Sequence, residues 1–248
     1  MAPFIAAIRF LTIFPLPGKY GTGQDDLAVS IPFFPIVGLG LGVIAWGLSW
    51  IFQIFFPPMV TATLMTCVLF VFSGGFHLDG LADTADGFFS ARSRKRILEI
   101  MRDSHVGVMG VIALIMVVLL KFSSLATLDR AGVMRAVLLM PIAGRCAIVI
   151  FMALLPYARP RGGLATLFYS NRSRLAGLWA FFFFTALCLI LYGLRAIVVV
   201  AFFSVTVLLF AWLCKKIING ATGDTLGAVC ELSEAVTALS AILVSWSI

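Results

Sequence analysis

Long apolar runs separated by short polar segments recur along the whole chain, and their length predicts helices that cross a membrane. Each run holds about 20 apolar residues, enough for an α-helix to span a hydrocarbon core of roughly 30 Å. Prolines and a segment rich in Pro, Arg and Gly mark breaks between runs. We predict about seven spans, at residues 36–56, 59–78, 108–126, 136–155, 175–193, 196–214 and 228–247. The expected fold is an all-α, polytopic integral membrane helical bundle.

Composition supports a membrane protein and argues against a soluble domain. The chain is 62% hydrophobic and 12% charged, with a mean hydropathy of +1.10, whereas soluble domains are about 25% charged. No internal repeat or linker divides it, so we expect one domain over residues 1–248. The 5 cysteines lie in apolar surroundings without a Cys-x-x-Cys spacing. We interpret them as small buried side chains rather than zinc ligands or disulfides.

The net charge of +7 is distributed as the topology of a membrane protein requires. Alternating the predicted spans across the bilayer places residues 1–35, 79–107, 156–174 and 215–227 on one side. That side receives most of the 18 basic residues, and the positive-inside rule makes it cytoplasmic. The other side receives Lys121, Arg130, Arg135 and Arg195, and Arg145 lies within a span. Because the basic residues form no solvent-facing stripe, nucleic-acid binding is not expected.

Three of the 11 acidic residues stand close together in HLDGLADTADGFF, residues 77–89. The spacing of Asp79, Asp83 and Asp86 is i, i+4, i+7, which places all three carboxylates along one face of a helix. Carboxylates near membrane depth are costly and need a compensating partner. Oxygen ligands without cysteine or clustered histidine favour a hard ion, Mg²⁺ or Mn²⁺. We therefore predict a Mg²⁺ site at Asp79, Asp83 and Asp86, and interpret His77 as a structural hydrogen-bonding residue.

Two further acidic segments begin on or near the predicted cytoplasmic face. In RKRILEIMRDSH, apolar and charged residues alternate as in a short amphipathic helix at the membrane interface, which carries Glu99 and Asp103. A surface ion pair would explain Glu99 equally well, and His105 is interpreted as structural. In NGATGDTLGAVCELSEA, glycines surround Asp224, and a helix continues through Glu231 and Glu234 into the last apolar run.

This third segment and Arg145 both point to phosphate chemistry. Backbone N–H groups at a glycine-rich helix start bind anions, so Gly223, Asp224, Gly227 and Glu231 are predicted to contact substrate phosphate. An arginine inside a span is expensive without an anionic partner, so Arg145 is predicted to pair with the acids or to clamp phosphate. A divalent ion beside an arginine is typical of phosphoryl transfer.

These motifs resemble one known family of membrane enzymes. The segments GGFHLDGLADTADGFF, EIMRDSHVGVMG, AGR, TGDTLGA, LTIFPLP and FFPIVGLGLG are similar to those of cobalamin synthases, the adenosylcobinamide-GDP ribazoletransferases. The similarity runs from about Thr12 to Glu231, nearly the whole chain. The HLDGLADTADG run is highly specific, whereas AGR or FPLP alone would mean little.

The resemblance implies a Mg²⁺-dependent transferase in a single membrane-embedded catalytic domain, late in cobalamin (vitamin B12) biosynthesis. Its substrates would be adenosylcobinamide-GDP and α-ribazole or α-ribazole 5'-phosphate, and its products adenosylcobalamin or its 5'-phosphate and GMP. The expected location is the inner (cytoplasmic) cell membrane, with the active site toward the cytoplasm and the lipid bilayer around the spans. A homo-oligomer is compatible with the sequence.

Reaction chemistry then assigns roles to the acids, with one assignment left open. Mg²⁺ held by Asp79, Asp83 and Asp86 would neutralise charge on the diphosphate while a ribose hydroxyl attacks phosphorus. Asp83 is accordingly counted among the catalytic residues. Glu99, Asp103 or Asp224 would complete the metal shell or act as general base.

Two other classes of protein fit the sequence less well. A CDP-alcohol phosphotransferase also uses clustered intramembrane aspartates and Mg²⁺, but Asp79-Gly80 lacks the following arginine of that family's pattern. An ion-coupled transporter would favour carboxylates near the bilayer midplane and two related halves, and the sequence has neither.

Overall fold

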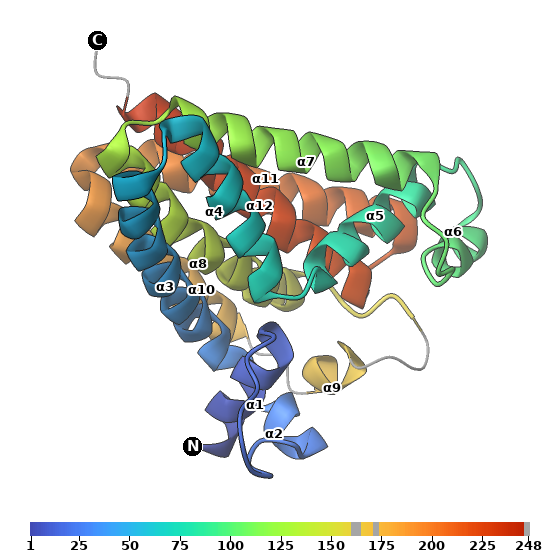
Figure 1. Ribbon diagram of the computed structural model, residues 1–248. Helices are drawn as coiled ribbons and strands as arrows, with labels where there is room; N and C mark the ends of the chain where they lie inside the picture. Colours follow the sequence, from blue (N-terminus) through green and yellow to red (C-terminus); the bar gives the residue numbers. More distant parts are fainter. Residues whose placement is uncertain (160–164, 171–173, 246–248) are drawn as a thin grey trace.

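The computed structural model describes residues 1–159, 165–170 and 174–245 (Figure 1). Helices make up the fold of this part of the chain, and one isolated β-bridge joins Tyr157 to Ala221. The helices, in chain order, are α1 (Ala2–Leu11), α2 (Gln24–Ala28), η1 (Ile31–Phe33), α3 (Phe34–Phe55), α4 (Pro58–Phe72), α5 (Phe76–Phe88), α6 (Arg94–Ile100), α7 (Val108–Thr127), α8 (Arg130–Leu154), α9 (Ala165–Ser170), α10 (Arg174–Tyr192), η2 (Gly193–Arg195), α11 (Ala196–Ile218) and α12 (Gly223–Ser245).

Five segments of the described chain are long and apolar enough to cross a membrane, and a bent helix pair makes a sixth. They are Ile31–Phe55, Val108–Thr127, Arg130–Leu154, Arg174–Ile218 and Gly223–Ser245, with the pair Pro58–Phe72 and Phe76–Phe88. The seven predicted ranges fall on these six segments, because 175–193 and 196–214 both lie on the 45-residue segment formed by α10, η2 and α11. Residues 246 and 247 of the last range lie outside the described residues. The all-α polytopic bundle is confirmed.

The span predicted over residues 59–78 is broken by a sharp bend. α4 ends at Phe72 and α5 begins at Phe76, and the two helix axes meet at 88°. Gly74 and Gly75 form the turn with φ angles of 60° and 76°. This left-handed region is readily open to glycine and strained for residues with a side chain. Because of this bend, helix α5, which carries the aspartates, runs across the bundle and does not follow the axis of α4.

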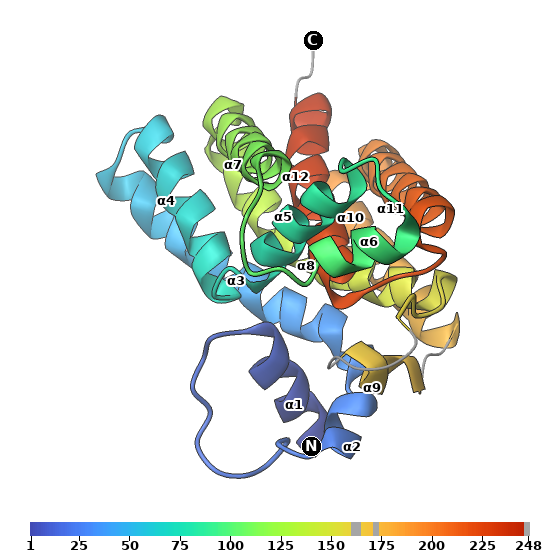
Figure 2. The same ribbon diagram turned by 90° about the vertical axis from the view of Figure 1, so that its right-hand side faces the viewer.

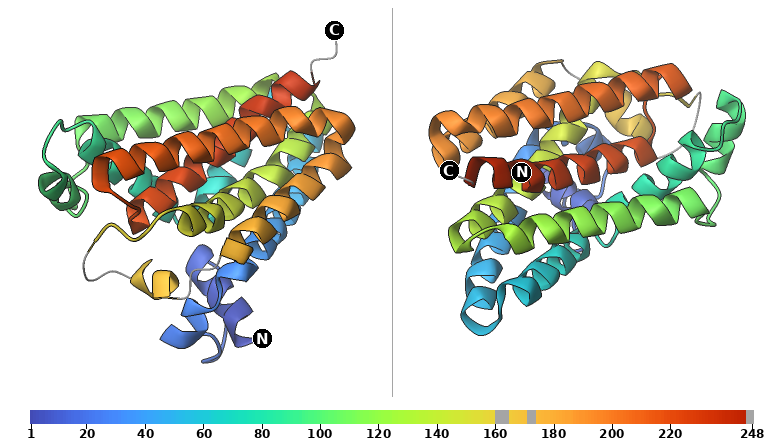
Figure 3. Two further views of the ribbon diagram at one scale, coloured as in Figure 1. Left: turned by 180° about the vertical axis from the view of Figure 1, so that it is seen from behind. Right: turned by 90° about the horizontal axis from the view of Figure 1, so that it is seen from above.

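α8 and α12 form the centre of the bundle. In the apolar stretch of α8, 78% of the residues are buried, and in that of α12, 72% are buried. The corresponding share is 28% for α7 and 28% for the α10–α11 segment. Seen from above, α12 lies between α7 and α11 (Figure 3). The outer helices expose large apolar side chains, for example Trp50, Phe182 and Trp212. A bilayer accommodates such a surface because it is itself apolar, so the chain is a multi-pass membrane protein.

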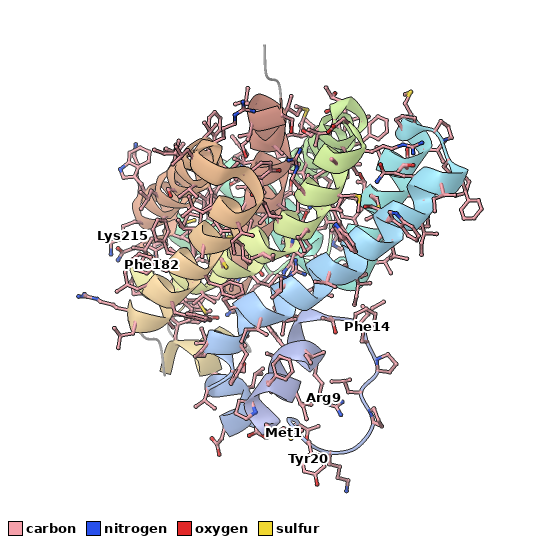
Figure 4. All side chains as sticks on the ribbon, turned by 90° about the vertical axis from the view of Figure 1, so that its left-hand side faces the viewer. Met1, Arg9, Phe14, Tyr20, Phe182 and Lys215 are labelled. Carbon is pink, nitrogen blue, oxygen red and sulfur yellow. The ribbon has the colours of Figure 1, made fainter. Side chains whose placement is uncertain are left out.

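Shorter helices cover one end of the bundle. α1, α2 and α9 lie together below it in Figure 1, and α6 lies beside α5 and α11 in Figure 2. The amphipathic prediction for α6 is confirmed, since Ile97 is buried while residues 94–96 are exposed. Figure 4 shows Arg9 turned toward the loop after α1, where its guanidinium donates to the carbonyls of Leu16 and Gly18 at 2.7 Å each.

Candidate functional site

The aspartate motif forms helix α5, so the predicted helical spacing is confirmed. Asp79, Asp83 and Asp86 therefore follow one another along one side of a 13-residue helix. Asp79 and Asp83 form no ion pair or hydrogen bond through their side chains with any described residue. Their charge needs another source of compensation.

Two glycines let α5 and α12 touch backbone to backbone (Figure 2). A Cβ atom on Gly80 would lie 2.6 Å from the carbonyl oxygen of Asp224, and one on Gly227 would lie 2.9 Å from that of His77. These distances exclude a side chain at either position unless the helices move. The contact brings the first turn of α12 against α5 and places Asp224 beside the aspartates of α5.

Carboxylates from the two helices thus gather at one crossing. The Asp83 carboxylate interacts electrostatically with those of Asp79, Asp224 and Asp86, and with the Arg159 guanidinium. Among the described residues, no three His, Cys, Asp or Glu side chains are arranged closely enough to hold a metal ion by themselves. The donor set still suits Mg²⁺, because this ion is commonly held by one or two carboxylates with substrate phosphates and waters completing the shell.

Asp86 has a structural task that its place in the motif did not reveal. Its carboxylate accepts the backbone N–H of Gly107 at 2.6 Å and that of Gly110 at 2.8 Å. These groups belong to the N-terminus of α7, whose first N–H groups have no partner within the helix. Asp86 therefore caps α7 from another helix, and its predicted role as a metal ligand stays a prediction.

Arg159 is a site residue that the sequence did not single out. Its Nη2 donates to Oδ2 of Asp224 at 2.8 Å. The segment is held there by the backbone, since the Ala158 N–H donates to the Ala221 carbonyl at 2.7 Å and the Ala221 N–H to that of Pro156 at 2.8 Å. In the sequence Arg159 is one of several basic loop residues and carries no distinguishing signal. Arg161 and Arg172 lie outside the described residues.

A cavity of about 200 Å³ opens beside this crossing. Its lining combines the polar side chains of His77, Asp79, Arg159 and Asp224 with aromatic rings, Phe10, Phe34, Phe76, Phe168 and Tyr157. Of the residues predicted to contact phosphate, Gly223, Asp224 and Gly227 line the cavity. Asp224 is oriented there by Arg159 and by the Thr222 hydroxyl, which donates to the same Oδ2 at 3.2 Å.

Arg145 and Glu231 lie deeper, in a buried network of charges. Lys121 Nζ donates to Oε2 of both Glu231 and Glu234 at 2.7 Å, and Arg145 donates to Oε1 of Glu234. All four side chains are at most 3% exposed. The expectation that Lys121 lies on the side opposite the cytoplasm is wrong, because this lysine is buried inside the bundle between α7 and α12. The pairing of Arg145 with an acid is confirmed, whereas its phosphate role stays a prediction.

The remaining predicted acids lie on or next to α6 at the protein surface. Glu99 pairs with Arg96 at 3.0 Å, and both side chains are exposed. It also lines a second groove, which shares Arg159 with the cavity. Asp103 is hydrogen-bonded to the His105 ring at 2.6 Å, and this bond lowers the pKa of the Asp103 carboxyl. His105 is thus a hydrogen-bonding residue as expected.

His77 departs from the same expectation. It is buried and lines the cavity, yet neither ring nitrogen has a hydrogen-bond partner among the described residues. A histidine placed only for structural hydrogen bonding would have one of these nitrogens engaged.

Comparisons with known proteins agree with these motifs. Residues 3–243 match the family described as cobalamin-5-phosphate synthase. An adenosylcobinamide-GDP ribazoletransferase of Acetivibrio thermocellus is 40% identical over 232 residues, 92% of each chain. One of Desulforamulus reducens is 42% identical over 92% of this chain and 91% of its own, and one of a Roseiflexus species is 41% identical over 98% and 90%. No solved structure matches the chain. With nearly its entire length aligned, this chain belongs to the cobalamin-5-phosphate synthase family.

Proposed function

We propose that the protein is an adenosylcobinamide-GDP ribazoletransferase. It joins adenosylcobinamide-GDP to α-ribazole or α-ribazole 5'-phosphate and yields adenosylcobalamin or its 5'-phosphate with GMP. The names of its relatives support this reaction. The structural observation that carries the proposal is the meeting of Asp79, Asp83, Asp224 and Arg159 at the α5–α12 crossing, next to a cavity.

The reaction is a substitution at phosphorus. A ribose hydroxyl of ribazole attacks the phosphorus nearest the cobinamide, the bond from that phosphorus to the bridging oxygen breaks, and GMP leaves with the bridging oxygen. Negative charge grows on the phosphate oxygens, so fixed cationic donors accelerate the step. Arg159 lines the cavity and would donate to these oxygens while holding Asp224 in place.

Among the three acids left open as general base, Asp224 fits the geometry best. It lines the cavity, whereas Glu99 and Asp103 lie at the exposed surface near α6. Both hydrogen bonds that its carboxylate accepts from the described residues, one from Arg159 and one from Thr222, use Oδ2. Oδ1 is therefore left to accept the proton of the attacking hydroxyl.

Asp79 and Asp83 are the side chains that we propose to bind Mg²⁺. They have no cationic partner of their own in the described structure, and a diphosphate would supply further oxygen ligands. When bound, Mg²⁺ neutralises charge on the diphosphate. Asp79 also lines the cavity and faces the same ligand.

The location follows from charge and from the position of the cavity. The cavity lies where α12 begins, near the segments that carry most of the basic residues. By the positive-inside rule we place this end at the cytoplasmic face of the inner cell membrane. Water-soluble nucleotide substrates would then reach the site from the cytoplasm.

The test is GMP release by purified protein given both substrates, with and without Mg²⁺. We expect activity that chelation abolishes and Mg²⁺ restores. Asp83→Asn should lose GMP release, whereas Asp129→Asn, at the N-cap of α8, should retain it. Absence of GMP from the unaltered protein, or CMP release from a CDP-alcohol instead, would refute the proposed reaction. Full activity of Asp83→Asn, or full activity after chelation, would refute the metal site alone.

A further inference from the structure

One wall of the cavity is built almost entirely of phenylalanine rings from four different helices. Phe10 lies 4.9 Å from Phe168 and 5.7 Å from Phe76 between ring centroids, and Phe34 lies 5.6 Å from Phe168. All four rings line the cavity, together with Ile148 and Leu226. Such a wall favours a flat, apolar ligand, because aromatic faces and edges pack against a π-system.

The volume limits which part of a substrate fits there. Pockets that enclose a drug-sized ligand measure roughly 300–1,000 Å³, and this cavity measures about 200 Å³. A corrin macrocycle is much larger than that, whereas a two-ring base is not. The two candidate occupants are therefore the base of ribazole and the guanine of the GDP group.

The polarity of the wall separates these two bases. Guanine has an amide and an amino group that need hydrogen-bond partners when they are buried. The benzimidazole of ribazole has neither, and only one free ring nitrogen. Among the described residues, the wall formed by the four phenylalanines, Ile148 and Leu226 has only hydrocarbon side chains, so guanine packed against it would leave its amide and amino group without partners. The remaining aromatic residue of the lining, Tyr157, lies two residues before Arg159.

His77 lines the same cavity and directly follows Phe76 of the aromatic wall in the sequence. It is 2% exposed, and its two ring nitrogens have no partner in the described structure. Its ring also contacts Phe76, at 5.6 Å between centroids. A buried imidazole without a partner is costly unless the ligand of the cavity supplies one.

We propose that the aromatic wall binds the base of the ribazole acceptor and that His77 hydrogen-bonds the same nucleoside. The inference rests on the proposed function and names a part of the site for one of its two substrates. Asp79, Asp224 and Arg159 then face the ribose and the diphosphate, where hydroxyl attack takes place. The acceptor is recognised by burial of its base and the donor by its phosphates.

The experiment measures KM for each substrate separately with the purified full-length protein. Phe168→Leu should raise KM for α-ribazole roughly tenfold, since a base stacked on an aromatic ring is worth about one order of magnitude in affinity. KM for adenosylcobinamide-GDP should stay unchanged. If Phe168→Leu does not fold, Phe10→Leu tests the same wall, because Phe10 is only half-buried. Phe184→Leu is the matched control, because Phe184 is buried against Phe203 at 4.4 Å and lines none of the cavities described above.

His77 is tested with two substitutions. His77→Leu removes the hydrogen-bonding group and should raise KM for α-ribazole roughly tenfold, whereas His77→Gln keeps such a group and should recover most of the affinity. A purely structural role would change stability without changing one KM selectively.

Binding of α-ribazole alone, measured by calorimetric titration, separates this inference from the proposed function. If the unaltered protein releases no GMP, the proposed function is refuted. The calorimetric titration still tests whether the aromatic wall binds ribazole. Weaker ribazole binding in the wall variants but not in Phe184→Leu supports it. Unchanged ribazole binding, or a rise in KM for adenosylcobinamide-GDP instead, overturns it.

Discussion

The contact between α5 and α12 at Gly80 makes the site sensitive to a small change. In Gly80→Ala, the new Cβ atom would lie 2.6 Å from the Asp224 carbonyl oxygen, 3.0 Å from its Cα and 3.2 Å from its carbonyl carbon. All three neighbours are backbone atoms, so no side chain can rotate away. The two helices must separate.

The size of the effect follows from these distances. Ordinary contact begins at 3.4 Å, so the oxygen must retreat by about 0.8 Å. Overpacking of this kind costs about 1–3 kcal/mol, and alanine returns roughly 1 kcal/mol through its higher helix propensity. A displacement near 1 Å between reacting groups costs roughly 10²-fold in rate. We therefore expect a protein that folds with slightly reduced stability and releases GMP roughly 10²-fold more slowly.

The assay pairs initial rates of GMP release with thermal unfolding in detergent, for Gly80→Ala and for Gly40→Ala. Gly40 lies in the interior of α3, and a Cβ atom there would meet nothing within 4 Å. That control should leave the rate unchanged and raise stability slightly. Wild-type activity in Gly80→Ala would refute the view that close packing of α5 on α12 positions the carboxylates.

Three further substitutions test other parts of the structure. Lys121→Met should lower the free energy of unfolding by about 3–5 kcal/mol, because it leaves buried carboxylates unpaired. Adding Glu231→Gln to this variant should recover part of the loss, and an unchanged unfolding midpoint of Lys121→Met would contradict the buried charge network. Asp86→Ala should cost about 0.5–2 kcal/mol through loss of the α7 cap, with Asp86→Asn closer to the wild type, and equal stability of both variants to the wild type would exclude capping. Arg159→Ala should reduce kcat roughly 10²–10³-fold as an electrostatic donor is removed, with partial activity in Arg159→Lys, whereas an unchanged kcat in Arg159→Ala would remove this residue from the site.

The helical character of the aspartate motif could be predicted because it depends on local geometry. A period of 3.6 residues per turn places positions i, i+4 and i+7 together wherever the helix lies. The apolar segments were predictable for a similar reason, since a chain in lipid must satisfy its backbone hydrogen bonds within each helix. The motif HLDGLADTADG likewise identified the family, which the comparisons with relatives confirm.

The partners of the charged residues could not be predicted in this way. Lys121 and Glu231 are 110 residues apart, and Arg159 and Asp224 are 65 apart. Whether a lysine in an apolar run ends a span or pairs inside the bundle depends on which face of another helix is opposite. The role of Asp86 was unpredictable for the same reason. It lies on the same face of α5 as Asp79, yet its carboxylate caps the N-terminus of α7.

By itself, then, the sequence determined the membrane-embedded all-α class, the helical aspartate face and the family, each of which is set by local periodicity, composition or motif. Only the tertiary structure decided which acids share a site. The turn at Gly74 and Gly75 swings α5 across the bundle, and the bare backbone of Gly80 and Gly227 lets α12 meet it. The physical reason is that the crossing of two helices depends on the packing of segments that are distant in the sequence. This crossing brings Asp79, Asp83 and Asp224 together with Arg159, which follows α8.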